Sequence, residues 1–278
     1  MYQSLSFGHA KVQETDFEKR LQLAKKHGFE AIESSAAEVM GMGVENFKSL
    51  IDKYGLKVSS TSLPFHPAEV DEAAFEEAMK VFPEQVAAMA AVGCTRWIIW
   101  IFPSSDKFTK EENYNLHIER MGAVAKVLKE YGARLGLEFV GPHPMRTNKK
   151  YTFIYTCEDM LELAAKCGDN VGVLFDIYHW YLSGNNKDVF EHIGDQEKII
   201  LVHVNDAAEG PIEEQPDSPR CLPGETGVID AKFAMDALRK MGYDGPIVTE
   251  PFSPKLPEMA DDDERVACIK ACMDKIGA

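Results

Sequence analysis

Short apolar runs alternate with helix-like segments along the whole chain. The runs lack the polar–apolar alternation of a sheet with one wet face, so they predict strands buried on both faces, as in a parallel sheet covered by helices. The predicted strands cover residues 2–7, 29–34, 56–63, 96–102, 133–140, 171–176, 198–205 and 246–251.

The segments between these runs carry helix start and stop signals. Thr15 and Glu18 have the spacing of a capping box, and Gly28 and Gly55 close the first two predicted helices. The predicted helices cover residues 15–27, 44–54, 71–92, 109–131, 158–167, 188–193, 231–241 and 261–276. This alternation predicts a (β/α)8 TIM barrel, formed by residues 1–278 as one domain. The competing doubly wound sheet lacks support, because no GxGxxG turn follows the first strand.

Four of the predicted strands end in a side chain that is costly to bury. These are Glu138, Asp176, His203 and Glu250. Any one of them has a structural explanation, such as an ion pair at the rim, a helix cap or a hydrogen-bonded core imidazole. In a parallel barrel, however, the carboxyl ends of the strands share one face, where active sites lie. The four together therefore predict a site for one divalent metal ion.

The donor set indicates which ion to expect. Three carboxylates and one imidazole favour Mn²⁺, ahead of Mg²⁺, Co²⁺, Fe²⁺ and Zn²⁺, and leave coordination positions for substrate oxygens.

Composition narrows the class of partner. The net charge of −15 argues against nucleic acid and anionic membranes, and leaves a small neutral molecule as the expected ligand. No signal peptide or membrane-spanning run is visible, and the six cysteines form no disulfide pattern, so we expect a cytoplasmic protein with free thiols.

The longest irregular stretch, residues 207–228, leaves the His203 strand on the face of the predicted site. A loop of this length in a compact domain is commonly functional, and we expect it to form an ordered lid that carries Arg220. Asp206, at its start, is expected to hydrogen-bond His203 or Arg220, with an ordinary surface position as the alternative.

The sequence resembles a known family from about residue 133 to residue 252. The motifs are GLEFVGP, LFDIYHW, VHVND, RCLPGETGVID and IVTEPF, in that order. They resemble the sugar phosphate isomerase/epimerase family of xylose isomerase-like TIM barrels, which includes ketose 3-epimerases and inosose isomerases and dehydratases. The resemblance implies that Glu138, Asp176, His203 and Glu250 bind the metal, that His179 and Arg220 touch substrate oxygens, and that Glu138 and Glu250 form the acid–base pair.

From this resemblance we expect a metal-dependent isomerase or epimerase of a keto-sugar or related polyol, acting by proton abstraction next to a chelated carbonyl through an enediolate. One departure matters: after Glu138 the chain reads FVGPHPMR, with Pro144 where ketose 3-epimerases carry a second Glu. His143, with Arg146 nearby, can then serve a different substrate. This favours a second hypothesis, a dehydratase or β-elimination lyase on a keto-sugar, inosose or 3-keto-glycoside at the same metal site.

Two other classes are weighed against these enzymes. A DNA-repair endonuclease on the same fold needs several zinc ions and a basic face, which the net charge of −15 opposes. A non-catalytic sugar-binding barrel has no need for both Glu138 and Glu250.

Aromatic side chains and histidines follow other strands. Trp100 and His66 are predicted to contact the sugar at the mouth of the barrel, with His9 and Phe102 nearby, although packing explains the aromatic residues equally well. Barrels of this kind often associate, so a homodimer or homotetramer is expected, without an interface that the sequence identifies.

Overall fold

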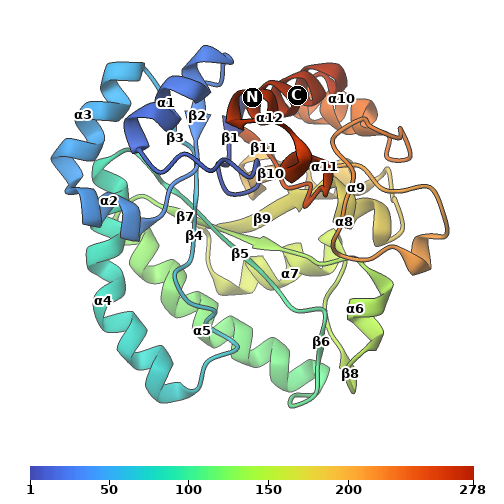
Figure 1. The fold of residues 1–278 in the computed structure, drawn as a ribbon. Coiled ribbons are helices and arrows are strands. Elements are labelled where there is room, and N and C mark those ends of the chain that lie inside the picture. The colour runs from blue at the N-terminus through green and yellow to red at the C-terminus, as the bar shows by residue number, and fades with distance from the viewer.

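In the computed structural model, which describes all of residues 1–278, parallel strands form a barrel surrounded by helices (Figure 1). The barrel strands are β1 (Tyr2–Leu5), β2 (Ala31–Ile32), β3 (Lys57–Val58), β4 (Thr61–Ser62), β5 (Arg96–Trp100), β7 (Arg134–Glu138), β9 (Val171–Asp176), β10 (Ile199–Val204) and β11 (Pro246–Thr249). All of them pair in parallel, in the order β3-β2-β1-β11-β10-β9-β7-β5-β4. The predicted TIM barrel is confirmed.

The barrel closes through a strand that is split between its two neighbours. β3 pairs with β2 and β4 pairs with β5, and only Ser59 and Ser60 separate the two halves. Both halves lie within the single predicted strand 56–63, so the nine strands of the sheet correspond to the eight of a TIM barrel.

Helices cover the outside of the barrel. They are α1 (Phe17–Lys26), α2 (Ala36–Met42), α3 (Val44–Tyr54), α4 (Glu72–Ala91), α5 (Lys110–Glu130), α6 (His143–Thr147), α7 (Cys157–Cys167), α8 (Ile177–Leu182), α9 (Val189–Ile193), α10 (Ala231–Met241), α11 (Lys255–Glu258) and α12 (Asp262–Ile276), with short 3₁₀ helices η1 (Gln196–Lys198) and η2 (Ile212–Glu214). None of the helices combines the length and apolar character that crossing a bilayer requires.

The structure adds local elements that the hydrophobic pattern did not indicate. The sequence did not predict α2, α6, α8 or α11, nor the antiparallel pair of β6 (Ser104–Ser105) and β8 (Tyr151–Thr152). The start of α1 also differs, because Asp16 rather than Thr15 caps it and accepts from the backbone N–H of Lys19. The long strand-following helices agree with the predicted ranges to within a few residues.

Apolar side chains fill two separate regions. The larger one lies between the sheet and the helices and contains the buried Trp97, Phe139 and Trp180. The smaller one consists of four side chains from β5, β9, β10 and β11, namely Ile98, Leu174, Leu201 and Val248. Ile98 and Leu174 also line the cavity described below, so this second cluster forms a dry floor beneath it.

Candidate metal centre

The four predicted ligands come from consecutive strands of the barrel. Glu138 and Asp176 end β7 and β9, His203 lies in β10, and Glu250 follows β11 directly. The strand register places His203 level with Asp176 on one side and with Val248 on the other. Because parallel strands end on one face, these four side chains meet above the apolar floor.

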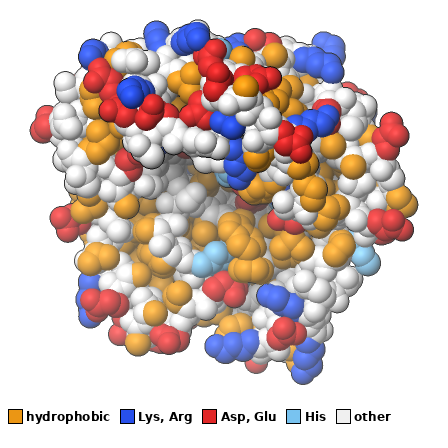
Figure 2. Space-filling view, viewed as in Figure 1, with side chains coloured by type: hydrophobic (Ala, Val, Ile, Leu, Met, Phe, Trp, Pro, Cys, Tyr) orange, Lys and Arg blue, Asp and Glu red, His pale blue; other side chains and the backbone are white.

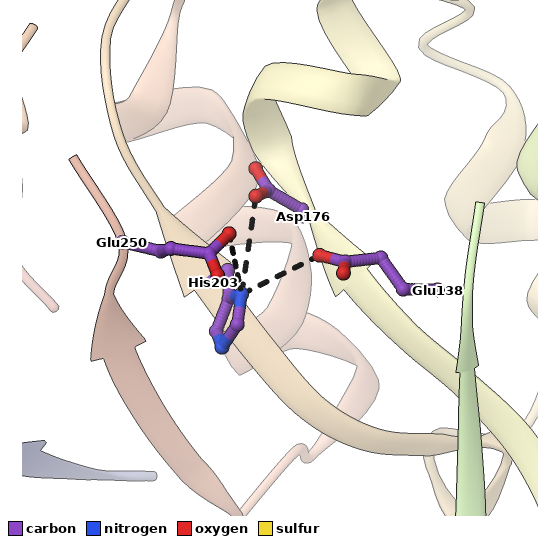
Figure 3. A group of neighbouring side chains, drawn as sticks. All are labelled: Glu138, Asp176, His203 and Glu250. Carbon is purple, nitrogen blue, oxygen red and sulfur yellow. Dashed lines mark ion pairs between the residues drawn. The ribbon is translucent and has the colours of Figure 1, made fainter. Parts of the chain in front are cut away.

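Each of the four residues offers a ligand atom, and these atoms all lie within 4.8 Å of one another. Figure 3 shows the three carboxylates pointing toward one edge of the His203 ring. Nδ1 of His203 lies 3.4 Å from Oε1 of Glu138, 3.5 Å from Oε2 of Glu250 and 3.9 Å from Oδ2 of Asp176.

Unpartnered polar atoms show that the group suits a metal ion. Oε1 of Glu138 and both ring nitrogens of His203 are buried and lack a hydrogen-bond partner. Such atoms are costly in a folded protein unless a ligand, water or ion satisfies them. The three carboxylates carry three negative charges and Arg220 supplies one positive charge. A divalent cation would balance the two negative charges that remain.

The pKa shifts show the same demand for positive charge. Burial and the Glu250 carboxylate raise the pKa of Glu138 to about 7. Burial acts in the same direction on Glu250, but the His203 and Arg220 cations outweigh it and hold the pKa of Glu250 well below its usual range. Burial would lower the pKa of His203, yet the two glutamates raise that pKa well above its usual value. The carboxylates thus draw a proton to the position that a metal ion would take, so metal binding would release protons.

Asn205 is a supporting residue that the sequence analysis missed. Its side-chain nitrogen donates to Asp176, 3.2 Å from Oδ2, and its side-chain oxygen accepts from the backbone N–H of Glu250 at 3.0 Å. Asn205 is fully buried and therefore orients two candidate ligands at once. It lies two residues after His203 in the HVND motif, which was the available signal.

Arg220 reaches the carboxylates from the long loop. Its Nη1 donates to Oδ2 of Asp176 at 2.9 Å and to Oε2 of Glu250 at 3.0 Å. Nη2 donates to Asp217 at 2.9 Å, and the guanidinium lies over the rings of Tyr178 and Phe252. The side chain is almost fully buried, and these contacts hold it in one orientation.

His179 lies beside Arg220 and has an unused donor. Its Nδ1 accepts from the backbone N–H of Gly141 at 3.3 Å, so the neutral ring carries its hydrogen on Nε2. Burial, reinforced by Arg220, lowers the pKa of His179 to about 4, which keeps the ring neutral at pH 7. Nε2 lies 3.3 Å from Nη2 of Arg220, which can only donate, and 3.8 Å from Asp217. In this tautomer the Nε2–H has no acceptor within hydrogen-bond distance and can donate to a ligand oxygen, whereas in the other tautomer Nε2 accepts from Arg220.

Gly141 permits this arrangement. A Cβ atom at residue 141 would lie 2.4 Å from the backbone oxygen of His179. Only glycine lets the two backbones approach closely enough for the Gly141 N–H to fix the ring.

The candidate centre opens into a cleft with two lobes, and Figure 2 shows this face of the molecule hollowed at its middle. A lobe of about 380 Å³ is bounded by His9, Glu33 and His66, and one of about 220 Å³ by His179, Asp217 and Arg220. Trp100, Glu138 and Glu250 line both. Together the lobes have the size and mixed polarity of a small-molecule site.

The structure brings most of the predicted contact residues to this cleft. Trp100 is 38% exposed, and its backbone oxygen forms a hydrogen bond of 2.7 Å with Nε2 of His66. His143 is different: it lies exposed at the start of α6 and lines neither lobe. Arg146 also lies outside both lobes and stacks on Tyr155.

Asp206 has a different role from the expected one. It contacts neither His203 nor Arg220. Its carboxylate accepts the backbone N–H groups of Ala207, Thr226, Gly227 and Ile229 at 2.7–3.0 Å. Asp206 thereby ties the two ends of the 207–228 loop together, and the loop places Asp217 and Arg220 in the wall of the cleft.

Comparison with known proteins gives the same fold. The model of the family described as xylose isomerase-like TIM barrel matches residues 21–272. The chain is 25% identical over 251 residues to an inosose isomerase of Bacillus velezensis, covering 88% of this chain and 86% of that protein. It is 24% identical over 240 residues to a ketose 3-epimerase of Arthrobacter globiformis, covering 84% and 76% of the two chains.

Solved structures superpose over almost the whole chain. A xylose isomerase domain protein from Alicyclobacillus acidocaldarius has a TM-score of 0.87 at 26% identity, with 99% of this chain and 98% of that chain covered. The IOLI protein, whose structure holds a zinc atom, has a TM-score of 0.84 at 21% identity with the same coverage.

Proposed function

The chain belongs to the xylose isomerase-like TIM barrel family, and on that premise we propose that it is a divalent-metal-dependent isomerase or epimerase of a keto-sugar or related polyol. One observation carries the proposal. Glu138 and Glu250 belong to the candidate metal centre and also line both lobes of the cleft, so two carboxylates face the same small space.

The reaction explains why two carboxylates are present. Moving a proton on a carbon beside a carbonyl requires a base to remove it and an acid to return it, each typically contributing about 10²- to 10⁴-fold in rate. In our proposal one of Glu138 and Glu250 removes the proton to give an enediolate and the other returns a proton. A divalent ion held by Glu138, Asp176, His203 and Glu250 would polarise the carbonyl and the adjacent hydroxyl.

The other cleft residues would orient the sugar. In the tautomer that carries its hydrogen on Nε2, His179 can donate to a substrate oxygen. Arg220 lies next to it, with Nη1 held by Asp176 and Glu250 and Nη2 by Asp217. Trp100 presents an apolar face to the ring, and His66 supports the position of Trp100. Holding the substrate in one orientation reduces the entropy lost in reaching the transition state.

We propose Mn²⁺ as the physiological ion, because three hard carboxylate oxygens outnumber the single imidazole. The zinc atom of the IOLI protein makes Zn²⁺ the main competitor. Elemental analysis of protein purified without added metal would identify the bound ion. Reconstitution of the chelated protein with each ion in turn would show which one supports turnover.

A deuterium wash-in experiment tests the reaction. Metal-loaded protein is incubated in D₂O with ketoses and inososes, the substrate types that the relatives' names suggest, and the products are read by NMR and mass spectrometry. We expect deuterium beside the carbonyl without any other change in formula. Glu250→Gln and Glu138→Gln should abolish the exchange, whereas Glu213→Gln, in the exposed part of the 207–228 loop, should not.

The same experiment separates the alternatives. Loss of water or of an aglycone would establish the dehydratase or lyase instead. No exchange with any substrate, despite stoichiometric metal, would reject these substrates. A protein that binds no divalent ion would overturn the proposed function.

A further inference from the structure

A second chamber adjoins the cleft on the side away from Arg220. It measures about 420 Å³ and lies beside the start of α2, between the ends of β1, β2 and β4. Glu33, Ser62, Leu63 and Pro64 line both this chamber and the larger lobe of the cleft, so the two spaces meet at these residues. Neither the candidate metal ligands nor His179 and Arg220 line the chamber.

The chamber wall combines small hydroxyl side chains with apolar faces. The residues that line it apart from the four shared ones are Ser6, Phe7, Gly8, Arg20, Ser34, Ser35, Ala36, Ala37, Thr61 and Gln85. The serine and threonine hydroxyls of this wall, with the Glu33 carboxylate at its edge, are groups that donate to or accept from sugar hydroxyls.

The charges of the chamber exclude an anion. Arg20 is its only cation, and it forms an ion pair with Glu38. Glu33 accepts from the hydroxyl of Ser60 at 2.7 Å and has no cation within ion-pair distance. A carboxylate without a counter-charge accepts hydroxyl hydrogens and repels phosphate.

We propose that this chamber binds a second hydroxyl-bearing unit of the substrate, with Glu33 at the junction accepting one of its hydroxyl hydrogens. The substrate would then be a keto-sugar that carries an uncharged glycosyl or polyol substituent, rather than a free or phosphorylated monosaccharide. This inference rests on the proposed function, because it places the reacting carbonyl at the metal centre and extends the substrate away from it.

The test compares substrates that differ only in the second unit. Metal-loaded protein is given D-fructose or its glucosyl derivatives leucrose and isomaltulose, which keep the ketone. Deuterium exchange gives kcat/KM, and calorimetry gives the binding constants whether or not turnover occurs. We expect the glucosyl-ketoses to be preferred by about tenfold or more, because their glucosyl unit hydrogen-bonds to Glu33 and to the hydroxyl-lined wall, which D-fructose does not reach.

A steric variant separates the chamber from the metal centre. Ala37→Trp places a large ring in the chamber from an exposed position of α2. It should lower the kcat/KM and the binding constants of the glucosyl-ketoses about tenfold, so that they approach the values for D-fructose. Met40→Trp, on the same helix but outside both cavities, is the matched control and should keep the preference.

A charge variant tests Glu33 itself. Glu33→Gln keeps the shape and can still accept from Ser60, but it removes the negative charge. D-Fructose 6-phosphate should bind more weakly than D-fructose to the unmodified protein. In Glu33→Gln the difference in affinity between the two sugars should be smaller, because the charge that repels the phosphate is gone.

The results distinguish a failure of the second chamber from a failure of the proposed function. Equal binding of D-fructose and both glucosyl-ketoses, or an equal effect of Ala37→Trp on all three, would overturn the second chamber while leaving the proposed function in place. Failure of the glucosyl-ketoses to bind would also overturn it. Binding with the expected preference but without deuterium exchange would support the chamber and count against the isomerase reaction.

Discussion

The side-chain amide of Asn205 joins Asp176 to the backbone of Glu250, with hydrogen bonds of 3.2 and 3.0 Å. This contact supports two of the four candidate ligands. Asn205→Leu should weaken metal binding by about 10- to 100-fold, because groups that orient ligands have effects of this size. Calorimetric titration of the chelated protein measures it.

Asn46→Leu, on the exposed surface of α3, is the control for this substitution and should bind the metal as the original protein does. Unchanged metal affinity in Asn205→Leu would show that Asn205 does not orient the ligands.

Arg220 is the built-in counter-charge of the centre. Arg220→Met keeps most of the side-chain length but leaves the Asp176 and Glu250 carboxylates buried without it. We expect the metal-free variant to lose about 3–5 kcal/mol of unfolding free energy. Adding a divalent ion should then raise its melting temperature by more than it raises that of the unmodified protein, as differential scanning calorimetry would show.

The control is Arg239→Met, which breaks an exposed ion pair with Asp236 and an exposed hydrogen bond to the backbone oxygen of Gly277. Such pairs contribute about 0–1 kcal/mol, so this variant should behave almost like the original. Equal metal-induced shifts in Arg220→Met and Arg239→Met would contradict the counter-charge role.

Asp206 should control the order of the long loop. Asp206→Ala removes the acceptor of four backbone N–H groups and should cost roughly 2–4 kcal/mol of stability, since hydrogen bonds to a buried charged group are lost. Limited proteolysis should cleave within residues 207–228 faster than in the original protein. Glu213→Gln, in η2 of the same loop, should leave the cleavage rate unchanged.

His117 should make folding stability depend on pH. This buried ring stacks on Phe153, and burial lowers its pKa to about 4, whereas its pKa in the unfolded chain is about 6.5. Between these values the unfolded state binds a proton that the folded state does not, so stability falls as the pH drops. From pH 7 to pH 5 the loss from this residue is roughly 2 kcal/mol.

Urea unfolding at the two pH values measures this difference. His117→Gln should show a smaller loss between pH 7 and pH 5 than the original protein, even if its stability at pH 7 is lower. The same loss in both proteins would assign the pH dependence to other groups.

The sequence predicted the barrel and the grouping of the four candidate ligands for one physical reason. Parallel strands buried on both faces read as unbroken apolar runs, and Glu138, Asp176, His203 and Glu250 interrupt those runs at equivalent positions. That regularity depends only on the strand pattern, so no long-range information was needed.

The missed features depend on contacts that a linear pattern does not contain. The helix α8 continues an apolar run, and its start becomes visible only because the Asp176 carboxylate accepts from the N–H of Tyr178 at 2.7 Å. The helix α2 is short, and Gly43 separates it from α3 while flanking both. The loop contacts of Asp206 join residues about twenty positions apart, which spacing rules do not address.

The split closing strand has a consequence for how the barrel moves. β3 pairs with β2, and β4 with β5, along only two residues each. This seam is therefore held by fewer ladder hydrogen bonds than the pairings β7–β9, β9–β10 and β10–β11. Amide protons at the seam should therefore exchange with solvent before those of the strands that carry the four candidate metal ligands. Transient opening there would widen the wall around Thr61 and Ser62, where a long substrate could enter, and would leave the charged centre on the opposite strands undisturbed.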